Sequence, residues 1–350
     1  MRYRILGGTG IEVSVHCLGA MMFGELGNSD PEDCTRIVNT ALEHGINFID
    51  TADGYSGGQS EEIVGRALKG RRDDVVLATK VHFPMGEGPN RSGNSRRWIV
   101  HEVENSLRRL QTDWIDLYQI HRPDPRTDIE ETLAALTDLV RAGKIRAFGT
   151  STFRPEEIVE AYHVAERRGL YRFRTEQPPY SILTRGIEAS VLPETRRLGM
   201  GVLTWSPLAF GFLSGKYRRD VPLEATDHRP KHHPGRFEPE LPENAAKYEA
   251  VEKLVALADD LGCTLPQLAV AFVVAHPGVT SAILGPRTGR QLEDLLKGAD
   301  LLLDDAALDR IDEIVPPGVD LHDPTTGNRV SPALTEKARR RRPLNERAAA

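Results

Sequence analysis

The feature that most constrains the fold is a unit of about 30 residues, a helical pattern followed directly by a short β run, which recurs along the chain. In the first unit, residues 31–45 carry apolar side chains at helical spacing, begin with a proline and end with a glycine, and the β run "INFID" follows at once. The later units end in "VVLATK", "IDLYQIH", "IRAFGTS", "FRTEQ", "GVLTWSP" and "TSAILG", and with "VHCLGA" as the first strand there are eight. Strands separated by helices pair in parallel through right-handed crossovers, which leaves an open doubly wound sheet or a closed barrel. Eight strands predict the barrel, an α/β protein of the (β/α)8 TIM type.

The first residues lie outside this repeat. The segment "YRILGGTGIEVS" alternates polar and apolar residues around three glycines, Gly7, Gly8 and Gly10. A dinucleotide-binding glycine loop must open a helix after a buried strand, whereas here a second strand-like run follows. We therefore predict a β-hairpin that plugs the floor of the barrel.

Two further segments break the repeat. Residues 208–243 form a long, Pro-rich and His-rich excursion after the seventh strand, and such excursions on a barrel are usually lids or partner loops. Its adjacent His232 and His233 are interpreted as solvated residues rather than as metal ligands. Residues 1–315 are expected to form a single barrel domain, and residues 316–350, with the basic run "RRRR", a C-terminal extension that is solvated and mobile.

Composition narrows the class of protein. A net charge of −6 argues against nucleic acid as the partner. The three cysteines, Cys17, Cys34 and Cys263, form no CxxC pair, which argues against a disulfide framework or a thiolate zinc site. No signal-peptide pattern is present, and no run reaches the roughly 20 apolar residues of a membrane span. We expect a cytoplasmic protein that engages no membrane.

Polar residues follow the inferred strands, at the end where barrels of this type place their sites. In strand order they are Asp50 with Tyr55, Lys80, His121, Ser151 with Thr152, Gln177, and Trp205 with Ser206. A tyrosine is a poor acid, with an ordinary pKa of about 10. A lysine ammonium beside it would lower the pKa of the phenol, and an aspartate would hold that ammonium in place.

Asp50, Tyr55 and Lys80 therefore contain the parts of a phenolic general acid, and His121 could orient a carbonyl or relay a proton. The residues alone leave a second interpretation open, in which the lysine–aspartate pair and the histidine are structural. Asp53 is interpreted as shaping the turn or touching the rim of the site.

Seven motifs, in order along nearly the whole chain, resemble those of the aldo-keto reductase superfamily. They are "FIDTADGY", "LATK", "DLYQIHRPD", "GTS", "EQPPYS", "WSPLAFGFLSGKY" and "ILGPRTGRQLEDLL". The likeness is greatest to bacterial aldehyde reductases and to the potassium-channel β-subunit branch. It implies a catalytic tetrad of Asp50, Tyr55, Lys80 and His121, with hydride transfer from NADPH to a carbonyl carbon and Tyr55 as the proton donor. Some β-subunit-like members carry Asn where this chain has His121, which favours a working enzyme here.

The resemblance also implies a cofactor site. Trp205 would stack on the nicotinamide, while Ser151, Thr152 and Gln177 would bind its carboxamide. A pyrophosphate loop would comprise Ser206, Pro207, Leu208, Ala209, Gly211 and Lys216. The last helix would contribute Gly285, Arg287, Gln291 and Asp294, with Arg287 on the 2′-phosphate favouring NADPH over NADH. Thr152 and the Asp294-Leu295 pair depart from the family pattern.

The substrate is less constrained. Candidate contacts are Met21, Met22, Phe23, Phe83, Trp98, Arg122 and Phe210. Similar reductases act on aldehydes and ketones, on aldose-type sugars, or on nucleotide-linked keto-deoxysugars, and the first of these is favoured. Two other classes stay open: a non-catalytic NADPH-binding accessory subunit, and, less favoured, a metal site on Asp50 and Asp53, for which no further acidic ligand follows the later strands. A homo-oligomer is also compatible with the family.

Overall fold

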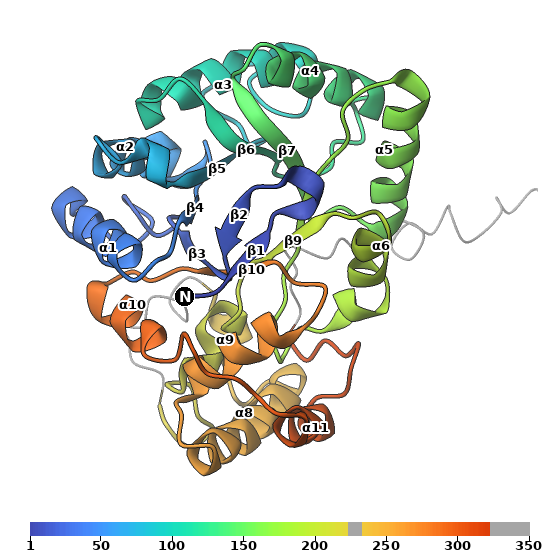
Figure 1. Cartoon of the computed structure of the whole chain (residues 1–350). Coiled ribbons are helices and arrows are strands. Elements are labelled where there is room, and N and C mark those ends of the chain that lie inside the picture. The colour runs from blue at the N-terminus through green and yellow to red at the C-terminus, as the bar shows by residue number, and fades with distance from the viewer. Residues whose placement is uncertain (223–232, 323–350) are drawn as a thin grey trace, which may run out of the picture.

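The computed structural model describes residues 1–222 and 233–322, and its centre is a closed barrel of eight parallel strands (Figure 1). The strands are β3 (His16–Gly19), β4 (Phe48–Asp50), β5 (Val76–Val81), β6 (Ile115–Ile120), β7 (Ile145–Ser151), β8 (Thr175–Gln177), β9 (Gly201–Thr204) and β10 (Ser281–Leu284). They pair in chain order, and β10 closes the barrel against β3. The predicted (β/α)8 fold and all eight predicted strands are confirmed.

Helices surround the barrel and pack an apolar face against it (Figure 1). They are α1 (Pro31–Glu43), α2 (Gln59–Ala67), α3 (Arg96–Leu110), α4 (Ile129–Arg141), α5 (Pro155–Arg168), α6 (Val191–Arg197), α8 (Pro242–Asp260), α9 (Leu265–Ala275), α10 (Gly289–Leu296) and α11 (Asp305–Ile314). Short 3-10 helices are η1 (Gly7–Thr9), η2 (Tyr55–Gly58), η3 (Arg72–Asp74), η4 (Gly186–Ala189), η5 (Ala209–Ser214) and η6 (Pro234–Arg236). The start of α1 shows the local cause: the Asp30 side chain accepts hydrogen bonds from the main-chain N–H groups of Glu32 and Asp33, and a proline occupies the first turn.

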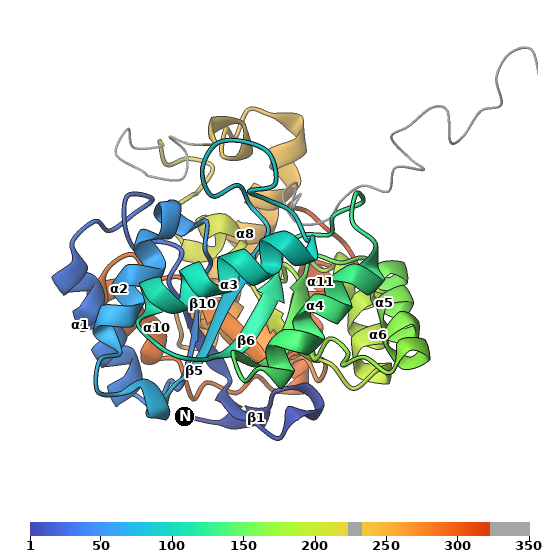
Figure 2. The same ribbon diagram turned by 90° about the horizontal axis from the view of Figure 1, so that it is seen from above.

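The N-terminal hairpin of β1 (Tyr3–Ile5) and β2 (Glu12–Ser14) closes the barrel floor, as predicted. Leu6 and Val13 are fully buried against side chains that point into the barrel from its strands. Those side chains are Cys17, Phe48, Ala78, Leu117, Ala147, Leu203 and Ile283. Gly7 permits this fit because its φ is +52° and a Cβ there would lie 2.3 Å from the Arg174 carbonyl oxygen. Figure 2 shows the hairpin at one end of the barrel, with α8 beyond the other.

The excursion after β9 is not loop alone. It contains η5 and η6 and leads into α8, a helix that the sequence interpretation did not separate from the following α9 unit. His233 is described and exposed, whereas His232 lies outside the described residues. Within the described chain no single helix has the length and apolar composition to cross a membrane, although α8 and α9, which meet at 92°, pass that test as a bent pair.

Residues 316–322, predicted to belong to the C-terminal extension, pack on the loop after β8. The Arg185 N–H donates to the Val319 carbonyl (3.2 Å), the Leu321 N–H donates to the Leu183 carbonyl (2.9 Å), and His322 is buried. Residues 316–322, which follow the predicted boundary at 315, are therefore held against the barrel by these contacts. Residues 323–350, the rest of that extension, lie outside the described residues.

Candidate active site

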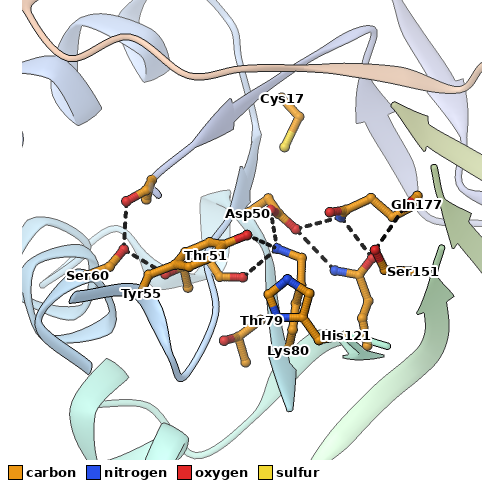
Figure 3. Close-up of polar contacts among 12 residues, drawn as sticks. Cys17, Asp50, Thr51, Tyr55, Ser60, Thr79, Lys80, His121, Ser151 and Gln177 are labelled. Carbon is orange, nitrogen blue, oxygen red and sulfur yellow. Dashed lines mark hydrogen bonds and ion pairs between the residues drawn. The ribbon is translucent and has the colours of Figure 1, made fainter. Parts of the chain in front are cut away.

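The site is the polar layer that lies directly above the apolar floor of the barrel. Because side chains alternate along a strand, the next inward position after Phe48 is Asp50, and the next after Ala78 is Lys80. Asp50, Lys80, His121, Ser151 and Gln177 all stand at the carboxyl ends of neighbouring strands and are buried. Figure 3 shows them converging, with Tyr55 reaching in from the loop after β4. The structure therefore brings together the side chains that the sequence placed at one mouth.

Lys80 is the centre of this layer. Its ammonium is fully buried and donates to Asp50 Oδ2 (2.5 Å), to the Thr51 carbonyl (2.8 Å) and to Tyr55 Oη (3.2 Å) (Figure 3). An ammonium has three hydrogens, so these three bonds use all of them. Tyr55 Oη is an acceptor in its bond with Lys80, which leaves the phenolic hydrogen available for another acceptor.

Asp50 is held from its other side by two amides. Gln119 Nε2 lies 3.1 Å and Gln177 Nε2 2.9 Å from Asp50 Oδ1, and Gln177 Nε2 also approaches Gln119 Oε1 at 3.0 Å. The sequence interpretation missed Gln119. It could have been found from its position two residues before His121, because residues two apart on a strand point to the same face, here the inside of the barrel.

Burial sets the protonation states of the site. It raises the pKa of Tyr55 above its ordinary value, and the nearby Lys80 charge offsets this only in part. Lys80 does act to lower the pKa of Tyr55, as expected, but loss of hydration outweighs the ion–phenolate attraction, so the resulting pKa is raised rather than lowered. Burial alone would lower the pKa of Lys80, but Asp50 and Tyr55 together outweigh it and raise that pKa. At neutral pH the pair is a phenol and an ammonium.

His121 is a neutral imidazole. Burial, with the charges of Lys80 and Arg122, holds its pKa well below the ordinary value. The ring meets the Tyr55 ring edge-on, with centroids 5.7 Å apart, and the Phe83 ring at 4.7 Å. A neutral ring beside the phenol can orient a carbonyl by one hydrogen bond, whereas it is poorly suited to store a proton.

Asp53 does not line the mouth. Its side chain is fully buried, Oδ1 accepts from the Gly54 N–H (2.6 Å), and its own N–H donates to the Lys80 carbonyl (3.2 Å). Burial, followed by the charges of Glu61 and Glu102, raises its pKa well above the ordinary range. The predicted role in shaping the turn is confirmed, and the alternative that it touches the rim is wrong.

The predicted carboxamide contacts lie at the ends of β7 and β8. Ser151 Oγ donates to the Gln177 carbonyl (2.9 Å), and the Thr152 N–H donates to the same oxygen (3.3 Å). Thr152 has φ +59°, a left-handed conformation that is uncommon for a threonine, and its buried hydroxyl finds no partner in the described chain. Trp205 is half-buried and meets the Phe210 ring edge-on at 5.8 Å.

The loop after β9 turns tightly. Ser206, Ala209, Phe210 and Gly211 have φ values of +59°, +47°, +58° and +96°. In this conformation three of their main-chain N–H groups are used within the loop: Ala209 donates to the Ser206 carbonyl (2.8 Å), Phe210 to Ser206 Oγ (2.7 Å) and Gly211 to the Leu208 carbonyl (2.8 Å). Lys216 is exposed a few residues further on, and Pro207 and Leu208 complete the loop. The exposed ammonium offers an anion a charged partner at this place.

Helix α10 follows β10, the strand that pairs with β9, and the residues between β10 and α10 are the next predicted cofactor contacts. A Cβ added to Gly285 would meet nothing within 4 Å, so this position is open to a ligand. Arg287 is half-buried; its N–H donates to Gln291 Oε1 (2.8 Å), and its carbonyl accepts from Asn28 Nδ2 (3.0 Å). The sequence interpretation missed Asn28, because it lies far from Arg287 in the chain and belongs to none of the recognised motifs. Asp294 is exposed and pairs with Lys297 at 2.9 Å.

The predicted substrate contacts divide by burial. Phe83 is 37% exposed, and the Arg122 guanidinium lies 5.7 Å from the centre of its ring. Met21 and Phe210 are half-buried and Met22 is nearly buried. Phe23 and Trp98 belong to the hydrophobic core instead, with 0% and 2% of their surfaces exposed, so neither offers surface to a substrate in this conformation.

A divalent metal on Asp50 and Asp53 finds no support in the geometry. Asp50 points into the barrel at Lys80, whereas Asp53 faces Gly54 and the Glu61 side. Across residues 1–222 and 233–322, no group of three or more His, Cys, Asp or Glu side chains is arranged to hold a metal ion.

Comparison with known proteins agrees with this geometry. The family model described as "Aldo/keto reductase family" matches residues 17–316. The chain is 40% identical over 327 residues to an uncharacterized oxidoreductase, YrpG, of Bacillus subtilis, covering 90% of this chain and 96% of the relative. It is 40% identical over 299 residues to aldo-keto reductase YhdN of the same organism, covering 84% and 88%. It is 36% identical over 330 residues to a probable voltage-gated potassium channel subunit beta of Arabidopsis thaliana, covering 90% and 97%.

Proposed function

The chain belongs to the aldo/keto reductase family of oxidoreductases, and we propose that it uses NADPH to reduce the carbonyl of an aldehyde, ketone or sugar to the alcohol, with Tyr55 as the general acid. The observation that carries this proposal is the hydrogen-bond count at Lys80. Its ammonium donates to Tyr55 Oη, so the phenolic hydrogen is left for a substrate oxygen. The raised pKa of Tyr55 keeps that hydrogen in place at neutral pH.

Each residue of the layer has a part in this chemistry. Tyr55 donates its proton to the carbonyl oxygen, and the Lys80 charge stabilises the phenolate that remains. Asp50, held by Gln119 and Gln177, fixes the ammonium in place. The neutral His121 ring orients the carbonyl beside Tyr55.

NADPH would supply the hydride, and residues at the ends of β7, β8, β9 and β10 would hold it. Ser151, Thr152 and Gln177 would hold the carboxamide, with Trp205 against the ring. The left-handed loop of Ser206, Pro207, Leu208, Ala209 and Gly211 would hold the pyrophosphate, with Lys216 nearby. Gly285, Arg287, Gln291 and Asp294 would hold the adenosine end, with Arg287 on the 2′-phosphate. The basis for choosing NADPH over NADH is this arginine.

A second function is supported by the similarity to a protein named as a channel β-subunit. In that case the chain would bind NADPH and tune a partner without turnover. The intact set of Tyr55, Lys80 and His121, with the phenolic hydrogen available, favours turnover. Within the catalytic proposal, a nucleotide-linked keto-deoxysugar is the alternative substrate, the cytoplasm is the expected setting, and both a monomer and a homo-oligomer are compatible with it.

The test follows NADPH absorbance with a panel of aldehydes and ketones, using wild type and Tyr55→Phe, together with NADPH binding by fluorescence. We expect turnover in the wild type, loss of about 10²-fold to 10⁴-fold in Tyr55→Phe, and unchanged NADPH binding. NADPH binding without turnover on any carbonyl would support the accessory function. Full turnover in Tyr55→Phe would exclude Tyr55 as the acid.

A further inference from the structure

Glu176 is a buried carboxyl that the mechanism above does not use. It lies in β8 immediately before Gln177, and its surface is 0% exposed. The register pairs Thr150 of β7 with Glu176 and Ser151 with Gln177. Because side chains alternate along a strand, the Ser151–Gln177 pair faces the barrel interior and the Thr150–Glu176 pair faces outward, behind the cofactor residues.

This carboxyl holds the turn that follows β7. Glu176 Oε1 accepts a hydrogen bond from the Phe153 N–H at 3.2 Å, and the Thr152 N–H also donates toward the Glu176 carboxyl. Thr152 is the residue with φ +59°, and a left-handed threonine persists only where its surroundings hold it. Ser151 and Thr152, the predicted carboxamide contacts, therefore depend on Glu176 for their main-chain path.

The contacts of Thr150 fit the neutral form of the Glu176 carboxyl. Thr150 Oγ1 lies 3.2 Å from the Thr175 carbonyl and 2.5 Å from Glu176 Oε2. A carbonyl oxygen can only accept, and a hydroxyl has one hydrogen. With an ionised Glu176, that one hydrogen faces two acceptors and can fully satisfy only one of them. With a neutral acid, Thr150 can donate to the Thr175 carbonyl while Glu176 donates to Thr150, so both contacts are satisfied at once.

We propose that Glu176 is a positioning residue that works as a neutral carboxylic acid, donating to Thr150 and accepting from Phe153, and so holds Ser151 and Thr152 in place for the cofactor's carboxamide. The last part of this inference, that Ser151 and Thr152 bind the cofactor's carboxamide, rests on the proposed function. The electrostatics agree: burial raises the pKa of Glu176 to about 8, and it outweighs the groups that would favour the carboxylate, which are Thr150 if it donates, the two main-chain N–H groups and then Arg122 at the end of β6.

Glutamine is the decisive substitution, because its amide can donate to Thr150 and accept from Phe153 as the neutral acid does, but carries no charge at any pH. Glu176→Ala removes both bonds. Glu130→Gln on α4, where the carboxyl is 42% exposed and pairs with Arg168, is the matched control. NADPH dissociation constants are measured by fluorescence without substrate, and kcat and KM with an aldehyde.

We expect Glu176→Gln to bind NADPH within about three-fold of wild type, and Glu176→Ala to bind it at least ten-fold more weakly, with a smaller fall in kcat. A Glu176→Gln variant as weak as Glu176→Ala would overturn the proposal, since an anion would then be required. Wild-type affinity in Glu176→Ala would overturn the positioning role.

A second measurement is independent of the cofactor. The folded pKa of about 8 lies above the ordinary 4.5, so the folded state keeps a proton that the unfolded state has lost between those values. Wild-type stability should therefore fall, relative to Glu176→Gln, as pH rises from 4.5 to about 8, and the gap in thermal midpoint should then stop growing. A gap independent of pH would refute the neutral acid. Wild type that binds no NADPH would refute the proposed function while this comparison stood.

Discussion

Replacing Lys80 by methionine is the sharpest perturbation of the site, because this side chain is fully buried and all its hydrogens are used. Methionine keeps much of the volume and removes the charge. The phenolate left after proton transfer loses its neighbouring cation, and we expect kcat to fall by about 10²-fold to 10⁴-fold. Ser151 and Gln177, the proposed nicotinamide contacts, do not bond to Lys80 directly, so NADPH affinity should stay within a few-fold.

The same change should weaken the fold. Asp50, of which 3% is exposed, loses its cation and keeps only the Gln119 and Gln177 amides. Breaking a buried ion pair by removing one partner costs about 3–5 kcal/mol.

A double variant separates the two effects. In Lys80→Met with Asp50→Asn, no buried charge is left alone, so urea unfolding should recover most of the lost stability while NADPH consumption stays as slow as in the single variant. Near-normal turnover in Lys80→Met would remove Lys80 from the acid. A double variant as unstable as the single one would refute the assignment of the loss to the uncompensated carboxylate.

Three other changes test separate parts of the structure. Arg287→Ala should raise the dissociation constant of NADPH much more than that of NADH, and equal losses in fluorescence titrations would mean that Arg287 does not touch the 2′-phosphate. Asp53→Ala should cost little in kcat where Asp50→Ala costs much, because the Asp53 side chain accepts from its own turn, at the Gly54 N–H, and the main-chain bond of Asp53 to the Lys80 carbonyl is kept in the variant; comparable losses in NADPH consumption would contradict this. Arg109→Met leaves Glu61 and Glu102 buried without their shared cation and should cost at least about 3–5 kcal/mol in urea unfolding at neutral pH. Burial already raises the pKa of Glu61, and an acid with a raised pKa destabilises the fold as pH rises, so that loss should shrink in acid and a constant loss would count against it.

The sequence predicted the barrel and the catalytic layer for one physical reason. A strand that ends at a fixed place in a repeat puts its last inward side chain at the mouth, so Asp50, Lys80 and His121 could be grouped without coordinates. The same rule would have found Gln119, two residues before His121. It could not find Asn28, whose bond to the Arg287 carbonyl depends on how two loops meet.

The protonation states of the site could not be predicted from residue types alone. A lysine beside a tyrosine suggests a lowered pKa for the phenol, yet the direction is set by how much water each group loses, which is a property of the packed barrel. A raised pKa of Tyr55 suits the proposed reaction better than the lowered pKa that the sequence suggested. In the proposed mechanism, a phenol with a raised pKa keeps its hydrogen until a carbonyl oxygen gains negative charge, and only then does the fixed Lys80 ammonium favour the phenolate. Tyr55 would thus serve as the acid because of where its hydrogen points, since Lys80 occupies one side of Tyr55 Oη and leaves the phenolic hydrogen available for a substrate oxygen.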